Sequence, residues 1–389
     1  MSTTGCAAII LAAGMSSRMG KFKPLLPLGA GTIVERVIDT FLENNVEVYV
    51  VAGYRKEEVS ECIKNPNVTV VDNDNYERGM FTSVQAGVGR LRADHKCFFV
   101  MPVDIPLVRP ATVARLMRAA SKHPEAVVYP VFVGQRGHPV LVPSRMRQSI
   151  MEWGGDGGLR AVLSQDTNSV DVVVPDANVV FDVDSPKDYW DLTERHMRMH
   201  APTTLECEVI LNDICRVSAD VRAHCLKVSE IAVLMGQSLG TAGCRLDLDA
   251  VRAGAMLHDI AKGRAHHETE GRRLVRSMGF GRIGRIIAAH TDFPAGSDPP
   301  IETKLVFLAD KLVKGTELVT IEERYESSSR AFALTAEVQE EITRRRSRAL
   351  SVKRELEDRM GRPLEEVLVK CGQGNEGNHG GLPLRVHGL

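Results

Sequence analysis

Directly after a short apolar run, the chain places a glycine turn, two serines and several basic side chains in LAAGMSSRMGKFKPLLPL, residues 11–28. Backbone N–H groups in such a turn can bind phosphate oxygens, and Arg18 and Lys23 can neutralise phosphate charge. Neither a Walker lysine followed by Ser or Thr nor the three-glycine dinucleotide fingerprint is present. Taken alone, either basic side chain is better explained as surface charge, so the interpretation depends on the other segments.

Carboxylates that could hold a metal ion occur in two later segments. In VMPVDIPLV, Asp104 follows an apolar run, where a carboxylate can hold Mg²⁺ between nucleotide phosphates. A turn or N-cap aspartate, which the nearby prolines allow, is the less favoured alternative. In FDVDSPKDY, Asp182 and Asp184 stand two apart on an extended run, which predicts that both lie on the same side of a strand. They could share a metal ion or end a solvated strand.

Two turns could contribute to the same site. NYERGMFTSVQAGV supplies Arg78 and Gly79 just before a helix that starts near Ser83. QRGHPVLVP supplies Gly137 and His138 in a turn between apolar runs. His138 is interpreted either as a binding residue or as a turn residue that faces solvent.

The second half of the chain carries side chains typical of metal ligands. His258 and Asp259 are adjacent, His224 precedes them and Asp310 follows them, each beside an apolar helix face. One buried histidine on a helix is usually a hydrogen-bonded core residue, but the joint occurrence favours a metal site among helices. The basic run RRRSR, residues 344–348, lies among glutamates, which favours a solvated helix face over an RNA contact.

Strand and helix patterns alternate from residue 6 to about residue 190, which is the arrangement that would position the first set of residues. Strands are predicted at 6–13, 46–53, 68–73, 96–104 and 126–133. Helices are predicted between them, in IVERVIDTFLENN, TSVQAGVGRLR and ATVARLMRAASK. The alternation predicts an α/β sandwich with a mostly parallel sheet, whose ligands bind beyond the carboxyl ends of the strands.

Residues from about 205 to 360 have long helical periodicities and almost no strand-like run, so this half is predicted to be all-α. One predicted helix face consists of Val221, Cys225, Val228, Ala232, Met235 and Leu239. The predicted domains are 1–198, 205–330, a helical extension at 331–371 and a Gly-rich disordered tail at 372–389, with a linker at 199–204.

Bulk composition is that of a globular protein with two domains. The chain has 389 residues, 43% of them hydrophobic and 25% charged, with a net charge of −1. That balance argues against nucleic acid or an anionic membrane as partner. Eight cysteines without a CxxC pair predict reduced thiols in a cytoplasmic protein, and the first apolar run is too short and lacks the flanking charge for a signal peptide or anchor.

Taken in order, LAAG, SSRMG, Lys23, VDIPLV, RGM-TS, RGHPV and DVDSPKDY resemble the NTP-transferase domain of molybdenum-cofactor nucleotidyltransferases over roughly residues 5–195. The resemblance implies a Rossmann-like three-layer fold and attack of a pterin phosphate on an NTP α-phosphorus, with Mg²⁺ as cofactor and pyrophosphate as by-product. The implied catalytic residues are Arg18, Lys23 and Asp104. The implied nucleotide-binding residues are Leu11, Ala12, Ala13, Gly14, Arg18, Lys23, Arg78, Gly79, Ser83, Gly137 and His138, and the implied metal ligands are Asp104, Asp182 and Asp184.

Ala13 favours CTP, because guanylyl members carry a second glycine in that first turn. Guanylyl or other nucleotidyl transfer to a phosphorylated acceptor is the alternative. The expected partners are the NTP, a molybdopterin-type acceptor and a molybdoenzyme maturation partner.

The His…His-Asp…Asp arrangement resembles HD-domain metal phosphohydrolases over about residues 215–320. His267, chosen over His266 because of its spacing to Gly271, and His290 resemble the extra ligands of members with two metals, notably the diadenosine tetraphosphate hydrolases. The implied ligands are His224, His258, Asp259, His267, His290 and Asp310, around two ions of Fe, Mn, Co or Zn. The ions would activate water against a phosphoanhydride, with Lys262 and Lys311 on the phosphate oxygens. A degenerate site that only senses nucleotides is the alternative.

Overall fold

The computed structural model describes residues 5–154, 156–294, 296–331 and 335–372. Contacts divide the chain into two compact units, one that runs to Arg216 and includes Arg273–Arg282, and one made of Val217–Arg272 and the chain from Ile283 onward. The tail predicted at 372–389 falls, from residue 373, outside the described residues. No helix within these ranges combines the length and apolar character that crossing a membrane requires.

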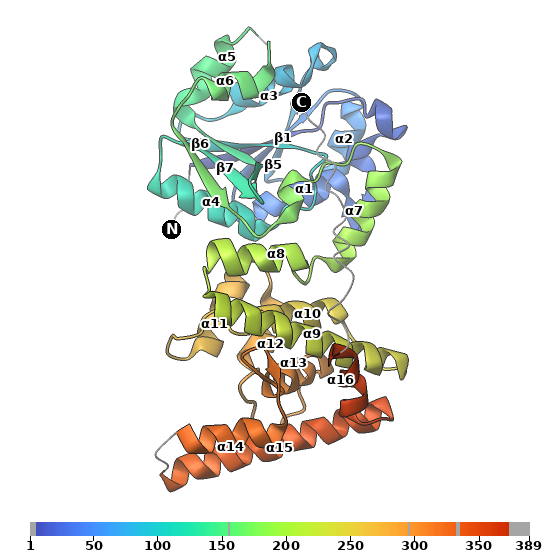
Figure 1. Cartoon of the computed structure of the whole chain (residues 1–389). Helices are drawn as coiled ribbons and strands as arrows, with labels where there is room; N and C mark the ends of the chain where they lie inside the picture. The colour runs from blue at the N-terminus through green and yellow to red at the C-terminus, as the bar shows by residue number, and fades with distance from the viewer. Residues whose placement is uncertain (1–4, 155, 295, 332–334, 373–389) are drawn as a thin grey trace. The chain divides into compact units, whose positions relative to one another are not determined.

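The first unit is built on a sheet in the order β10-β7-β9-β6-β1-β4-β5, with β8 paired to β7. Its strands are β1 Cys6–Leu11, β4 Glu47–Ala52, β5 Val68–Asp72, β6 Cys97–Pro102, β7 Val127–Phe132, β8 Gln135–Arg136, β9 Val140–Pro143 and β10 Ser169–Val173. Figure 1 labels four of these strands, β1, β5, β6 and β7. Pairing is parallel except for β9 and β8, which are antiparallel to their neighbours. The mostly parallel sheet predicted from the sequence is therefore confirmed.

Two apolar cores lie on opposite faces of this sheet because successive side chains of a strand alternate. Ile10 and Phe99 face a core that includes residues of α1 Ile33–Leu42 and α4 Pro110–Lys122. Ile9 and Phe98 face a second core. That core includes residues of α3 Met80–Arg90, α5 Arg147–Glu152 and α6 Gly158–Ser164. The result is a three-layer α/β/α arrangement, with these helices on the two sides of the sheet in Figure 1.

Further elements complete the first unit. They are β2 Pro27–Leu28, β3 Gly31–Thr32, α2 Lys56–Cys62, α7 Pro186–Arg198, α8 Thr204–Val209, the 3₁₀ turns η1 Ser17–Met19, η2 Lys23–Leu25, η3 Tyr76–Arg78, η4 Ser144–Met146 and η5 Ala177–Val180, and the π turn η6 Ile210–Ile214. The segment 199–204, predicted as a linker between domains, spans the break between α7 and α8 and lies inside the first unit, which runs to Arg216. Ser185 caps α7 through a capping box with Asp188.

The second unit is helical. Its helices are α9 Ala219–Thr241, α10 Leu248–Leu257, α11 His267–Ser277, α12 Gly281–Ala288, α13 Ile301–Lys311, α14 Ile321–Ala331, α15 Ala336–Met360 and α16 Leu364–Gly372, of which residues 273–282 group with the first unit. The apolar face predicted for α9 is buried at Cys225, Val228, Ala232, Met235 and Leu239. Against the all-α expectation, β11 Val313–Lys314 and β12 Glu317–Leu318 form a small hairpin, because Gly315 with φ +62° permits the tight turn after α13.

Candidate active sites

The first cavity has a volume of about 540 Å³ and lies where β1 and β6 end. These strands are parallel neighbours, yet the chain continues from β1 to β4 on one side and reaches β6 only later on the other. Such a reversal leaves a crevice at the carboxyl ends of the strands. The predicted residues that line it are Leu11, Ala13, Gly14, Arg18, Lys23, Gly79, Ser83, Asp104 and Asp184.

Lys23 is the centre of the charged groups in this cavity. Its side chain is 8% exposed, and Nζ lies 3.2 Å from Oδ2 of Asp104 and 3.1 Å from Oδ1 of Asp184. Arg18 is 79% exposed, and its Nη1 lies 2.7 Å from Oδ2 of Asp184. The structure therefore joins three segments that are far apart in the chain into one cluster of two cations and two carboxylates.

Asp104 and Asp184 fit a Mg²⁺ site, because carboxylate oxygens are the ligands this ion prefers and both converge on one ammonium. Asp182 does not join them: it is exposed and is absent from the described residues that line the cavity. The expectation of a strand at Asp182 and Asp184 is wrong, since residues 181–184 form an irregular segment between η5 and α7. Without the strand alternation, nothing aligns the two carboxylates.

Four predicted binding residues are not among the described residues that line the cavity: Ala12, Arg78, Gly137 and His138. Ala12 is buried and donates its N–H to the carbonyl of Val51. A Cβ on Gly137 would lie 2.2 Å from the Val179 carbonyl oxygen, so the glycine permits a close backbone approach. His138 is half-buried and burial lowers its pKa, so the interpretation as a turn residue facing solvent does not hold.

The sequence reasoning missed several lining residues, notably Met15, Ser16, Tyr76 and Met80. Ser16 has φ 55°, and its Oγ accepts the backbone N–H of Lys23 at 3.1 Å, which shapes the turn. Met15 and Met80 are 54% and 62% exposed and give the cavity an apolar edge. The serine pair in SSRMG was the available signal, whereas nothing in the spacing pointed to the methionines.

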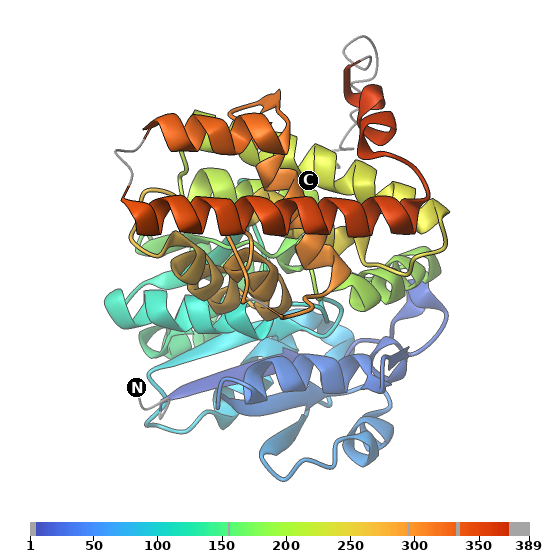
Figure 2. The same ribbon diagram turned by 90° about the horizontal axis from the view of Figure 1, so that it is seen from below.

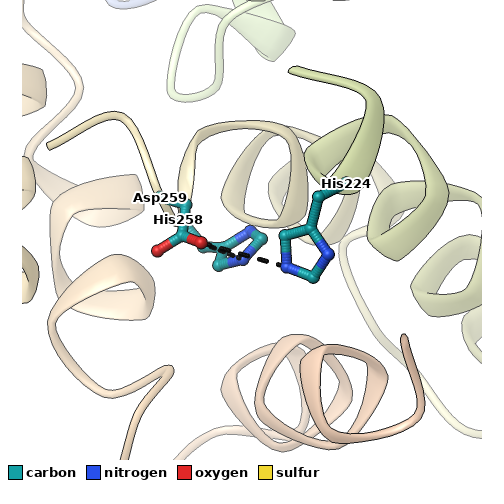
Figure 3. A group of neighbouring side chains, drawn as sticks. All are labelled: His224, His258 and Asp259. Atoms are coloured by element: carbon teal, nitrogen blue, oxygen red, sulfur yellow. Dashed lines mark ion pairs between the residues drawn. The ribbon is translucent and has the colours of Figure 1, made fainter. Parts of the chain in front are cut away.

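The second site is a cluster of histidines and aspartates in the helical unit, part of which Figure 3 shows. One group is His224, His258 and Asp259, and the other is Asp259, His267 and His290; within each, the candidate ligand atoms lie within 4.8 Å of one another. Asp310 adjoins the first group, with its Oδ1 3.2 Å from Nε2 of His224 and 3.6 Å from Nε2 of His258. All six predicted ligands are therefore brought together.

Backbone carbonyls orient three of the histidines. Nδ1 lies 2.9 Å from the Gly315 carbonyl in His224, 2.7 Å from the Ala255 carbonyl in His258 and 2.6 Å from the Ile287 carbonyl in His290. If each Nδ1 donates its proton there, Nε2 keeps a lone pair directed at the aspartates, as metal-binding histidines do. Nε2 of His258 is buried without a hydrogen-bond partner in the described part of the chain. The residues fit a divalent metal ion.

Charge at this cluster favours the ligand-competent forms of both aspartates and of His290, whereas burial opposes protonation of His258 but Cys225 and Asp310 raise its pKa. Burial opposes ionisation of Asp259, but the hydrogen bond to His290 and the charges of His258 and Lys262 hold its pKa below the ordinary value. Burial likewise opposes ionisation of Asp310, whose pKa Lys311, His224 and His258 lower. Burial lowers the pKa of His290 and favours its neutral form.

Surrounding residues clarify two sequence-based choices. His266 has φ 51° and is exposed, whereas Nε2 of His267 lies 3.3 Å from Nε2 of His290. Of the two adjacent histidines, His267 is therefore the one that lies in the cluster. The basic run 344–348 is not wholly solvated: Arg345 lines the cavity beside the cluster and Arg348 pairs with Asp292. The helical period turns these two inward because they lie three residues apart on α15.

Comparison with known proteins gives the family. The MobA-like NTP transferase domain matches residues 8–170 and the HD domain matches residues 221–315. A molybdenum cofactor cytidylyltransferase of Escherichia coli is 33% identical over 198 residues, which cover 50% of this chain and 98% of the relative. A protein of Bacillus mycoides named “Probable molybdenum cofactor guanylyltransferase” is 27% identical over 181 residues, 45% of this chain and 82% of the relative.

Among solved structures, a nucleotidyl transferase from Methanothermobacter has 22% identity and a TM-score of 0.44, with 51% of this chain and 100% of that chain covered. The sequence matches define a nucleotidyltransferase that is joined to an HD domain. The chain belongs to the MobA-like NTP transferase family, and relatives named as molybdenum cofactor cytidylyltransferase and probable molybdenum cofactor guanylyltransferase match its first half.

Proposed function

We propose that residues 1–198 form a Mg²⁺-dependent transferase domain that moves CMP from CTP to a molybdopterin-type acceptor and releases pyrophosphate. The main support for the proposal is the position of Lys23 between Asp104 and Asp184, in a cavity that is also lined by the turn that follows β1, residues 13–17. The cytidylyl preference is supported by Ala13 and by the name of the Escherichia coli relative. Guanylyl transfer is the second candidate, supported by the Bacillus relative.

In the proposed reaction, an acceptor phosphate oxygen attacks the α-phosphorus and the bond to the pyrophosphate breaks in line. No protein nucleophile is needed, because the protein's task is positioning and charge stabilisation. Lys23 and Arg18 would contact the phosphate oxygens on which charge builds up, while N–H groups of the turn at Gly14 hold the triphosphate. Mg²⁺, when held by Asp104 and Asp184, would neutralise further phosphate charge.

The test is pyrophosphate release with molybdopterin as acceptor and CTP, GTP, ATP or UTP as donor. A clear preference for CTP is expected, since the proposal assigns the base choice to the first turn. Preference for GTP would replace the cytidylyl assignment with the guanylyl one, and no release with any of the four would remove the transferase assignment. Omission of Mg²⁺ should abolish release.

For residues 205–330 we propose an HD phosphohydrolase domain with two divalent ions, followed by a helical extension at 331–371. It is supported by two ligand groups that share Asp259. The ions, when bound, would supply Lewis acidity and an activated water. Lys262, whose Nζ lies 2.6 Å from Asp259, and Lys311, whose Nζ lies 2.7 Å from Asp310, would meet the phosphate oxygens.

A nucleotide sensor that binds without cleaving is the alternative for this domain. Metal analysis of the purified protein together with phosphate release from phosphoanhydrides separates the two. The hydrolase proposal expects bound metal and metal-dependent release of phosphate. A protein that contains no metal and releases no phosphate would favour the sensor.

A further inference from the structure

The cavity beside the histidine cluster is rich in positive side chains. It has a volume of about 280 Å³, and the cations that line it are Lys262, Lys311, Arg324 and Arg345. The carboxylates among its lining residues are Asp259 and Asp310. The lining therefore carries an excess of positive charge before any metal is counted.

Half of these cations come from outside the segment that matches the HD domain, residues 221–315. Arg324 lies on α14 and Arg345 on α15, two helices that run side by side (Figures 1 and 2). Tyr325, also on α14, is 8% exposed, and burial raises its pKa to about 12, so its phenol adds no negative charge to the cavity. The helices after the matched segment thus build one wall of the cavity.

Contacts within the unit hold this wall next to the metal ligands. Arg324 donates from Nη1 to the Val313 carbonyl at 3.1 Å, and its Nη2 lies 4.0 Å from Oδ1 of Asp310. On α15, Arg348 pairs with Asp292, which follows His290 by two residues. The guanidinium of Arg345 lies one helical turn from that anchor, with its Nε 2.7 Å from Oε1 of Glu341 on the same helix and 3.9 Å from Oδ2 of Asp292.

The arrangement of charges favours phosphoanhydrides over phosphomonoesters as ligands of this cavity. A phosphomonoester carries about two negative charges, which ions at the histidine cluster would already meet. A chain of two or more phosphates carries additional charge beyond the reach of those ions and needs further cations. Arginine is suited to this task because its planar guanidinium can donate two parallel hydrogen bonds to one phosphate.

We propose that Arg324 and Arg345 bind the outer phosphate of a pyrophosphoryl chain whose inner phosphate lies at the histidine cluster. The inference rests on the proposed phosphohydrolase function and assigns contact with the outer phosphate to two helices that follow the segment matched by the HD domain. Hydrolysis would form a bond from water oxygen to one phosphorus and break the bridging P–O bond. The bridging oxygen leaves with the second phosphate, and the protons of water are shared between the two products. Pyrophosphate and dinucleoside tetraphosphates both contain such a pyrophosphoryl chain.

Binding of imidodiphosphate, a non-hydrolysable pyrophosphate analogue, to the full-length metal-loaded protein tests the wall without relying on turnover. Arg345→Ala is expected to weaken calorimetric binding roughly tenfold, the size of one charge-assisted contact, and Arg345→Lys to restore part of it. Arg346→Ala is the matched control: Arg346 is a neighbour on α15 that pairs with Glu322 at 3.8 Å and is not among the cavity residues. Its affinity should change less than twofold. Equal affinity of wild type and Arg345→Ala would overturn the proposal.

Turnover of pyrophosphate, diadenosine tetraphosphate and 4-nitrophenyl phosphate shows whether the phosphate chain is inorganic or nucleosidic. It also separates failure of the hydrolase proposal from failure of the proposed role of Arg324 and Arg345. Arg345→Ala should raise KM for one or both anhydrides at unchanged kcat and leave the monoester unaffected; equal losses for the monoester would contradict the proposal. If no substrate is turned over but Arg345→Ala binds imidodiphosphate more weakly than wild type, the hydrolase proposal is refuted and the proposed phosphate binding by Arg324 and Arg345 is supported. If the wild-type protein hydrolyses the anhydrides and Arg345→Ala changes neither KM nor imidodiphosphate affinity, only the proposed phosphate binding by Arg324 and Arg345 is refuted.

Discussion

Lys23 is a nearly buried cation whose position is set by two carboxylates from distant segments. Burying an ammonium is unfavourable unless opposite charges compensate it, so Asp104 and Asp184 make this position possible. The same arrangement aims Nζ into the cavity at the end of β1, where a triphosphate would lie under the proposed function. A charge that is already in place costs no reorganisation when the transition state forms.

Replacement of this single side chain should therefore affect rate more than substrate binding. For Lys23→Gln we expect kcat of nucleotidyl transfer to fall by roughly 10²- to 10³-fold, the loss typical of one preorganised charge stabiliser. The control is Lys21→Gln, an exposed lysine two residues away, whose rate should stay near that of wild type. Pyrophosphate release under saturating CTP measures both variants, and a wild-type kcat in Lys23→Gln would contradict the assigned role.

A second prediction at this scale concerns metal content. His258 is fully buried, and its Nε2 faces the cluster without a hydrogen-bond partner among the described residues, so His258→Ala should lower bound metal from about two ions per chain to one or none. His266→Ala, at the exposed histidine beside the cluster residue His267, should keep the full content. Mass spectrometry of metal in proteins purified side by side checks this, and equal metal in all three proteins would remove His258 as a ligand.

At the scale of elements, α8 is joined to the sheet layer by a buried ion-pair network that sequence reasoning did not foresee. Nη1 of Arg109 lies 2.7 Å from Oδ1 of Asp176 and 2.7 Å from Oε1 of Glu206, and all three side chains are buried. Glu206 also completes the capping box that starts α8 at Thr203. One carboxylate thus starts a helix and attaches it to α4 and η5.

Removal of that carboxylate should destabilise the first unit strongly. Glu206→Ala leaves part of the Arg109 charge uncompensated and is expected to lower the free energy of unfolding by about 3 kcal/mol. Glu208→Ala on the same helix, at a half-buried glutamate, is expected to change it by less than about 1 kcal/mol. Urea unfolding followed by circular dichroism gives both values. Equal midpoints for the two variants would show that the network adds little.

At the scale of the whole molecule, the two sites are built from separate parts of the chain. The cavity at Lys23 is lined by residues of the first unit, whereas the histidine cluster and its cavity belong to the second. The lining sets share no residue among the described parts of the chain. Chemistry at one site should therefore not need the side chains of the other.

Paired variants of the full chain test this independence. Asp104→Ala should abolish nucleotidyl transfer and leave phosphate release from pyrophosphate within about twofold of wild type, and His258→Ala should do the reverse. Both reactions are measured on the same preparations, with circular dichroism as the check on folding. Loss of both activities in a folded Asp104→Ala protein would mean that the sites depend on one another.

Local sequence patterns determined much of this protein. Continuous apolar runs predicted the parallel strands β1, β4, β5, β6 and β7 but not β10, and the helical period of Val228, Ala232, Met235 and Leu239 predicted the buried face of α9. Residue chemistry and family resemblance together selected the six side chains that meet at the histidine cluster. These features depend on chain-local periodicity or on residue type, which a sequence records directly.

Only the tertiary structure decided which charged groups meet. It placed Asp184 on Lys23 and left Asp182 exposed, turned Arg345 into a cavity while Arg346 stayed outside, and buried Arg109 between two carboxylates. Two residues of the same type that lie close together in the sequence, such as Asp182 and Asp184 or Arg345 and Arg346, cannot be told apart by residue type or by local pattern. The positions of these residues differ because packing sets the direction of each side chain, and the interactions that result join residues up to 166 positions apart.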